Sequence, residues 1–144
     1  MQPEQSYANH RRFHPLFHFI VIPLLAINVV VQIVIAVRFF SAMSVWNVFV
    51  ALAILGGAFL ARFYGLRNQD RIIRLEEMLR LQRVLPDDLR ARIGELRTRQ
   101  LIGLRFCSDE ELPEACRAVF AGEAPTHDAI KRRVKSWRPD YMRL

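Results

Sequence analysis

Two long apolar runs occupy the first half of the chain, and amphipathic segments follow them. The first run, residues 16–37, has 22 consecutive residues without Asp, Glu, Lys or Arg. A helix rises about 1.5 Å per residue, so this run spans roughly 33 Å, close to the ~30 Å hydrocarbon core of a bilayer. The second run, residues 45–61, has 17 residues and reaches spanning length if it continues to Leu66 with Arg62 extended toward the surface. The pattern predicts two transmembrane helices that form an antiparallel hairpin.

The second span is expected to continue as a helical stalk over residues 67–85, because nothing breaks the helix before Pro86. Apolar residues of the stalk fall on two faces: Ile72, Leu75 and Leu79 on one, and Met78, Leu81 and Leu85 on the other. Its charges offer i,i+4 pairs such as Glu76–Arg80. A solvated helix rarely carries this much apolar surface, so the stalk is expected to pack against the rest of the tail, a second copy of the chain, or both.

The last part of the chain, residues 86–144, has the pattern of about four short helices. Polar residues that suit helix N-termini precede each one: Asp87 or Asp88, Thr98, Ser108 with Glu111, and Thr126. The four helices are expected to end near Leu96, near Phe106, before Gly122 and near Trp137. About sixty residues bury little core alone, so docking on the stalk would help this small bundle to fold.

These elements predict an all-α fold, a membrane α-helical hairpin whose second helix continues into a cytoplasmic stalk and a small helical bundle. The divisions are an N-terminal cytoplasmic tail at 1–15, spans at 16–38 and 45–66, an external loop at 39–44, the stalk at 67–85 and a cytoplasmic helical domain at 86–144.

The positive charge lies on one side of the predicted hairpin. The chain carries 21 Lys and Arg against 14 Asp and Glu, and 18 of the basic residues follow Ala61. Arg11 and Arg12 precede the first span, and an arginine-rich stretch follows the second, whereas Arg38 is the one basic residue between the spans. The positive-inside rule therefore places both termini in the cytoplasm. Only two of the basic residues are lysine, a bias typical of GC-rich genomes, so we expect a multi-pass protein of a bacterial inner (cytoplasmic) membrane.

Polar residues inside the spans suggest how the hairpin packs. Asn28 and Gln32 lie on one side of the first span, and Asn47 begins a small-and-polar side of the second. We interpret all three as interhelical hydrogen-bonding residues. The alternative, a substrate or ion path, would need several copies of the chain, because two spans cannot enclose a pore.

Three histidines, His10, His14 and His18, are spaced by four residues near the first span. On one continuous helix they would form a metal- or haem-ligand stripe. Pro15 is expected to begin the helix and leave His10 outside it, and no neighbouring carboxylate or thiol completes a site. We therefore expect no metal and no cofactor, with His14 and His18 the nearest candidates, and an anchoring role at the bilayer surface.

Residues 127–138 predict a basic amphipathic helix, with Ile130, Val134 and Trp137 on one face. Its basic surface comprises Lys131, Arg132, Arg133, Lys135 and Arg138. The simplest interpretation is a docked helix with a solvated basic side, and contact with anionic lipid is the next. Nucleic acid is not expected, because the second helix of the helix–turn–helix-like pair begins with three acidic residues at 109–111.

The two cysteines, Cys107 and Cys116, are too few for a disulfide framework or a zinc site and are expected in the core. The chain has no P-loop, GxSxG, HExxH or CxxC motif, and no residue is assigned a catalytic role.

Four fragments in order, HRRFHPLFHF, QDRIIRLEEMLRLQRVLP, QLIGLRF-x-SDEELPE and IKRRVKSWRPDY, resemble a family of small bacterial two-span membrane proteins of unknown function. The resemblance extends over the chain from about Tyr7 and implies a bacterial integral membrane protein, with no activity attached. We therefore expect a non-enzymatic accessory or scaffold subunit, either a homo-oligomer or part of a larger membrane complex. One alternative is a membrane-tethered sensor or regulator that binds anionic lipid or nucleic acid through residues 127–138. Another is an oligomeric transporter-like or metal- or haem-binding membrane protein.

Overall fold

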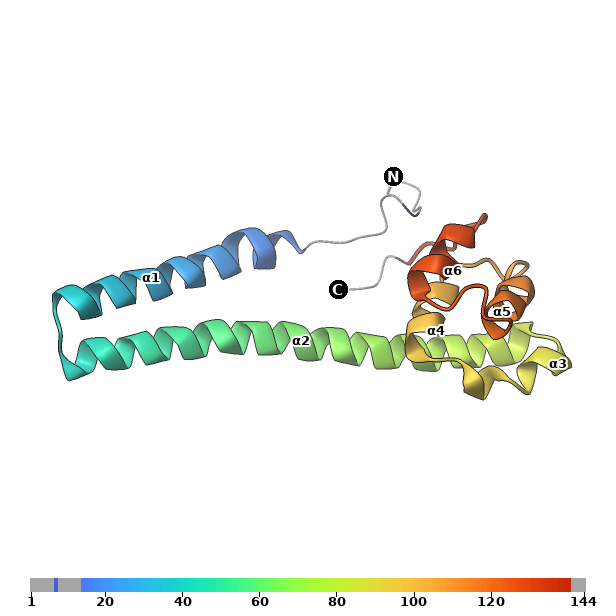
Figure 1. Cartoon of the computed structure of the whole chain (residues 1–144), viewed down its shortest axis with the longest axis horizontal. Coiled ribbons are helices and arrows are strands. Elements are labelled where there is room, and N and C mark those ends of the chain that lie inside the picture. Colours follow the sequence, from blue (N-terminus) through green and yellow to red (C-terminus); the bar gives the residue numbers. More distant parts are fainter. Residues whose placement is uncertain (1–6, 8–13, 141–144) are drawn as a thin grey trace. The chain divides into compact units, whose positions relative to one another are not determined.

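The computed structural model describes Tyr7 and residues 14–140, and this part of the chain is all-α, as predicted (Figure 1). Its six α-helices are α1 (Ile22–Arg38), α2 (Ala42–Val84), α3 (Asp87–Arg90), α4 (Thr98–Leu104), α5 (Leu112–Phe120) and α6 (His127–Arg133). The chain divides into two compact units. The hairpin unit is Arg12–Leu66, and the tail unit is Arg67–Leu144 together with Met1–Arg11.

Two helical stretches are long and apolar enough to cross a membrane, Leu16–Arg38 and Ala42–Val84. Their apolar side chains in the hairpin unit are largely uncovered: Leu24, Ile27 and Val30 of α1 are each more than half exposed. Val29, Ser44 and Ala51 of this unit are buried. Such a surface is costly in water and suits hydrocarbon.

The first of these stretches begins as a π-helix, Leu16–Val21, before it continues as α1. The Ile22 N–H donates to the Phe17 carbonyl five residues earlier. Pro23 follows at once, and its ring has no N–H and crowds the carbonyl four residues before it. A widened turn relieves that crowding. Pro23 thus coincides with a π-helical segment on its N-terminal side.

Helix α2 begins at Ala42, three residues before the start predicted at Val45. The reason is a reciprocal cap: the Ser44 N–H donates to the Ser41 hydroxyl at 3.0 Å, and the Ser41 N–H donates to the Ser44 hydroxyl at 2.9 Å. This is the geometry of a capping box, with serine in place of the usual glutamate. The connection between α1 and α2 is therefore shorter than the predicted loop.

The tail unit has its own hydrophobic core. Leu81 of α2 and Leu85, the residue directly after it, supply one wall. Fully buried residues of the short helices supply the rest, among them Leu101, Leu104, Leu112 and Cys116. The predicted stalk thus packs on the tail core through Met78, Leu81 and Leu85, whereas Ile72, Leu75 and Leu79 stay exposed. The predicted docking of the stalk is confirmed for one of its two faces.

Helices α4 and α6 approach each other closely at Gly103. A Cβ atom on this glycine would lie 3.0 Å from the carbonyl oxygen of His127 and 3.0 Å from the Cβ of Ile130. Real Cβ atoms seldom come this close to other heavy atoms, so the approach depends on glycine. Gly103 therefore sets the spacing of the most extensive helix pair in the tail unit.

The predicted helix caps were right in part. The Thr126 hydroxyl accepts from the Ala129 N–H at 3.1 Å and caps α6 as expected. Elsewhere the cap residue lies one position earlier than predicted: Pro86 precedes α3, and Arg97 precedes α4. The first short helix is also interrupted, because α3 ends at Arg90 and a 3₁₀ turn, Ile93–Glu95, follows.

The basic helix predicted over 127–138 is wrong in its second half. Helix α6 ends at Arg133, and Val134 is extended. Residues 134–138 pair instead with the segment before α5: the Ser108 N–H donates to the Ser136 carbonyl at 3.1 Å, and the Arg138 N–H donates to the Phe106 carbonyl at 2.8 Å. Because these bonds fix the backbone in an extended form, Ile130 and Trp137 do not share a helical face.

Candidate functional site

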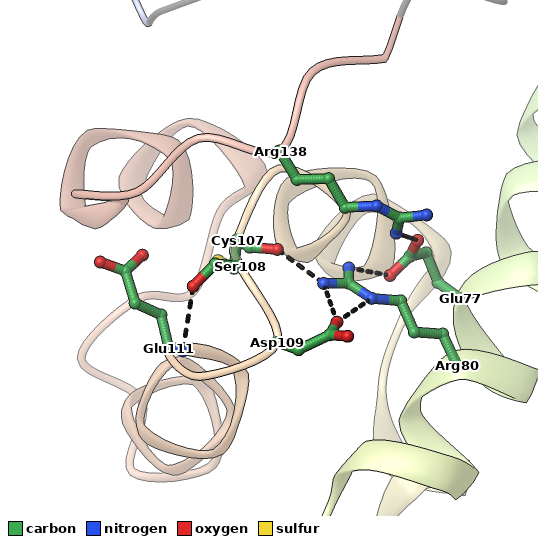
Figure 2. Close-up of polar contacts among 7 residues, drawn as sticks. All are labelled: Glu77, Arg80, Cys107, Ser108, Asp109, Glu111 and Arg138. Carbon is green, nitrogen blue, oxygen red and sulfur yellow. Dashed lines mark hydrogen bonds and ion pairs between the residues drawn. The ribbon is translucent and has the colours of Figure 1, made fainter.

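A buried arginine, Arg80 of α2, organises the polar interior of the tail unit (Figure 2). Its Nε donates to Asp109 Oδ1 at 2.8 Å, and its Nη2 lies 2.6 Å from the same oxygen. Nη2 also donates to the Cys107 carbonyl at 2.7 Å, and Nη1 donates to Glu77 Oε2 at 3.1 Å. All three guanidinium nitrogens are thus engaged, which offsets the cost of burying the charge.

Glu77 lies between two arginines, Arg80 and Arg138. Arg138 Nη1 is 3.4 Å from Glu77 Oε1, on the other side of the carboxylate from Arg80 (Figure 2). The Glu77 side chain is only 6% exposed, and this burial raises its pKa despite the opposing charge of Arg80 and Arg138. Desolvation therefore outweighs ion pairing at this carboxylate. We refer to Glu77, Arg80, Asp109 and Arg138 as the Arg80 cluster.

The Arg80 cluster joins three separate stretches of the tail unit: α2, the loop before α5 and the segment after α6. Glu111 adds a second tie between the latter two, because its carboxylate accepts from the Lys135 N–H at 3.3 Å and the Ser136 N–H at 3.0 Å. The capping box predicted for Ser108 is accordingly half formed. Ser108 accepts from the Glu111 N–H at 3.4 Å, but the Glu111 side chain is used elsewhere. These contacts hold the three stretches of the tail unit together.

Both cysteines lie in the core, as predicted, with exposures of 1% for Cys107 and 0% for Cys116. Burial raises the pKa of each thiol to about 12. At neutral pH both are therefore protonated and poorly nucleophilic.

The predicted basic surface is only partly present. Lys131 is buried, and its ammonium lies 5.2 Å from the centre of the Phe106 ring, so its assignment as a surface residue was wrong. Three of the others form ion pairs with acids of the tail unit: Arg132 with Asp128 at 3.2 Å, Arg133 with Glu123 at 3.0 Å, and Arg138 with Glu77. Lys135 is exposed.

Tyr7 is hydrogen-bonded to α6, a contact that no pattern in the sequence indicates. Its hydroxyl lies 3.0 Å from both carboxylate oxygens of Asp128 and accepts from Arg132 Nε at 3.1 Å. The hydrogen bond from Tyr7 lowers the pKa of Asp128, with Arg132 assisting. Part of the predicted N-terminal tail is therefore hydrogen-bonded to the tail unit.

A cleft of about 760 Å³ lies between α5 and α6. Its walls include both basic and acidic residues, with Arg117, Arg132, Arg133 and Lys135 opposed by Glu111, Glu114 and Glu123. Because both signs of charge line it, the cleft offers no uniform field for an anionic or a cationic ligand.

The polar residues of the hairpin unit contact each other less than expected. Asn28 and Gln32 are half-buried on one side of α1, where Gln32 Nε2 donates to Asn28 Oδ1 at 3.5 Å, a contact within one helix. Asn47 is exposed, and its interhelical role stays a prediction.

The histidines do not assemble a metal site within the described residues. The His14 and His18 rings bond locally, with His18 Nδ1 2.9 Å from the His14 carbonyl and the Phe17 N–H donating to His14 Nδ1 at 3.3 Å. Among the residues that the structure describes, no group of three His, Cys, Asp or Glu side chains could hold a metal ion. His10 lies outside the described residues.

This geometry defines a class: an all-α protein with two apolar helices of membrane-spanning length and a helical tail unit clasped by buried charges. The whole chain, residues 1–144, matches the model of DUF6526, a family of unknown function, and the chain belongs to that family. No curated protein and no solved structure matches it. The predicted membership of an uncharacterised family is confirmed, and it brings no activity or site residue with it.

Proposed function

We propose that this chain is a non-enzymatic integral membrane protein that presents its tail unit at the cytoplasmic face of a bacterial inner membrane. In this role it is an accessory or scaffold subunit, either a homo-oligomer or part of a larger complex. The observation that carries the proposal is the contrast between the two units. The hairpin unit exposes most of its large apolar side chains, whereas the tail unit buries its own core.

The dimensions and charges support insertion as a hairpin. Leu16–Arg38 has 23 residues, or roughly 34 Å of helix at about 1.5 Å per residue, enough for one crossing. Arginines flank the two outer ends of the hairpin, and Arg38 alone lies near the turn. This asymmetry favours both termini in the cytoplasm.

A non-catalytic role is supported by how the polar groups of the tail unit are used. The Arg80 cluster and Glu111 hold chain segments together, and the cysteine thiols are buried and protonated. These residues stabilise a shape, which is what a presenting or scaffolding domain requires.

Topology and association can be tested on the full chain in its native membrane. Carbonate extraction should leave the protein in the membrane pellet, and a cytoplasm-active reporter fused after Leu144 should be active. A reporter inserted after Phe40 should instead be active only outside the cytoplasm. Purification in a mild detergent, followed by mass spectrometry, should recover partner proteins or a multiple of the 16.8 kDa chain. Extraction by carbonate, or a periplasmic C-terminus, would contradict the proposal.

The alternative, a membrane-tethered sensor that acts through residues 127–138, has less support. Arg132 and Arg133 are already paired with acids, and Lys131 is buried. If anionic lipid is nevertheless the ligand, binding to phosphatidylglycerol vesicles should be salt-sensitive and lost in an Arg132→Glu, Arg133→Glu variant. A matched duplex DNA probe in the same assay distinguishes lipid from nucleic acid.

A further inference from the structure

One apolar stripe of the tail unit is not covered by any described part of the chain. Ile72, Leu75 and Leu79 of α2 are 57%, 62% and 55% exposed. On the opposite side of the same helix, Ile73 and Leu81 are buried in the tail unit. The stripe therefore lies on the face of α2 that points away from the tail core.

The spacing of the stripe is that of a coiled-coil seam. Its residues are separated by three and then four positions, and Asn68 and Gln82 continue the alternation at the two ends. In heptad terms Ile72 and Leu79 occupy a positions, and Leu75 occupies a d position. Ile72 at a followed by Leu75 at d is the combination that favours two-stranded parallel pairing.

The charges beside the stripe are self-complementary. Arg71 occupies a g position and Glu76 the e position five residues later, which is the pairing used across parallel two-stranded coiled coils. Both side chains are exposed, and neither forms an ion pair or hydrogen bond with a described residue. The i,i+4 pair predicted between Glu76 and Arg80 does not form, because Arg80 turns inward to Glu77. In a symmetric dimer, Arg71 of each copy would meet Glu76 of the other, giving two pairs.

We infer that α2 binds α2 of a second copy as a parallel, in-register coiled coil through Ile72, Leu75 and Leu79. The parallel direction rests on the proposed function, since two copies inserted with the same topology bring α2 out of the same membrane face. Confinement in the bilayer also raises the effective concentration of the two helices, so a seam of only a few layers is sufficient. The inference assigns the uncovered stripe to a homodimer contact and leaves the cleft between α5 and α6 free for other partners.

Cysteine crosslinking of the full chain in native membranes tests this register. Single variants Asn68→Cys, Leu75→Cys and Gln82→Cys place a thiol at three successive d positions, and all three should form disulfide-linked dimers under mild oxidation. Arg74→Cys, an exposed position on the same helix but off the seam, is the matched control and should not crosslink. The native cysteines are buried and should not form intermolecular disulfides. Crosslinking at position 75 alone would indicate an antiparallel pair, and equal crosslinking at position 74 would indicate unspecific aggregation; either result overturns the inference.

Charge exchange provides an independent test in the Leu75→Cys background. Glu76→Arg sets two arginines against each other on both flanks and should lower the crosslinked fraction. Adding Arg71→Glu restores opposite charges and should restore crosslinking. A crosslinked fraction that stays the same in both variants overturns the proposed seam. All altered side chains are exposed, so loss of folding does not confuse the result.

Carbonate extraction of the same membranes separates the two proposals. Protein that stays in the pellet but does not crosslink overturns the dimer and leaves the proposed function standing. Protein that is extracted overturns the membrane proposal itself, and with it the parallel dimer that depends on it.

Discussion

Replacing Arg80 with methionine is the most direct way to test the electrostatic account of the tail unit. Methionine keeps the length of the apolar stem but removes every donor to Glu77, Asp109 and the Cys107 carbonyl. Glu77 would then remain buried with only the longer contact to Arg138, at 3.4 Å. Removing one partner of a buried ion pair typically costs about 3–5 kcal/mol, and we expect Arg80→Met to fall in this range.

The companion changes distinguish this explanation from simple loss of packing. Glu77→Gln removes the buried charge but keeps an acceptor, so we expect a cost of no more than about 1 kcal/mol. In the double variant the orphaned charge is gone, and about 2 kcal/mol of the Arg80→Met loss should return. Arg90→Met is the matched control: the half-exposed Arg90 pairs with Asp87 at 3.0 Å and donates to the Leu85 carbonyl at 2.9 Å, and losing both contacts should cost about 1–2 kcal/mol.

Urea unfolding of the full chain in detergent provides the measurement. The Trp137 ring lies 5.0 Å from the Phe106 ring in the tail unit, so its fluorescence reports on this unit once Trp46 has been replaced by phenylalanine. The reasoning would be refuted if Arg80→Met cost no more than Arg90→Met. It would also be refuted if the double variant lost the sum of the two single losses, because then Glu77 and Arg80 would not be coupled.

Three further predictions concern the same unit. Gly103→Ala should destabilise it by about 1–3 kcal/mol, because the added methyl meets the α6 backbone, whereas Gly94→Ala, with nothing within 4 Å, should be close to neutral in the same unfolding assay. Cys107 and Cys116, with pKa values of about 12, should resist maleimide in the native protein and react in urea; rapid native labelling would contradict their burial. The pKa of Glu77 is raised above 4.5, so the stability of the wild type relative to Glu77→Gln should be highest below that pH and decline as pH rises through the folded-state pKa; a flat difference in unfolding free energy would exclude the shift.

The apolar helices could be predicted because their signal is local. A run of 22 uncharged residues at 16–37 requires a nonpolar environment whatever the rest of the chain does. The boundary at Ala42 lies outside the usual capping pattern, because Ser44 takes the place of the glutamate or glutamine that normally pairs with a capping serine. A Ser-x-x-Ser pattern at the end of the loop was the available signal.

The end of α6 could not be predicted from local periodicity. Ile130, Val134 and Trp137 have ideal helical spacing, yet the chain turns extended after Arg133. The competing interactions come from residues distant in sequence, above all the Glu111 carboxylate that binds two N–H groups of the extended segment. Tertiary hydrogen bonds of this kind override propensity and leave no mark in the spacing.

The Arg80 cluster left a signal that a face-by-face analysis of α2 could have used. Glu77 and Arg80 share a helical face with Ile73 and Leu81, which are buried. A charged pair on an apolar face is either a buried pair or an interface, because charge is costly to bury alone. What no pattern could supply was the partner Asp109, which comes from a loop 29 residues away.

Two charged residues without an ion-pair partner among the described residues, Arg71 and Glu76, lie on α2, outside the basic surface predicted at residues 127–138. The sequence placed the basic surface on residues 127–138, but the arginines there are already balanced by acids of the same unit. Arg71 and Glu76 on α2 lack such partners among the described residues and flank an apolar stripe. An anionic membrane or a nucleic acid would attract Arg71 and repel Glu76, whereas a second copy of α2 can pair with both residues. These charges therefore support the proposed dimer more than they support binding to a uniformly charged surface.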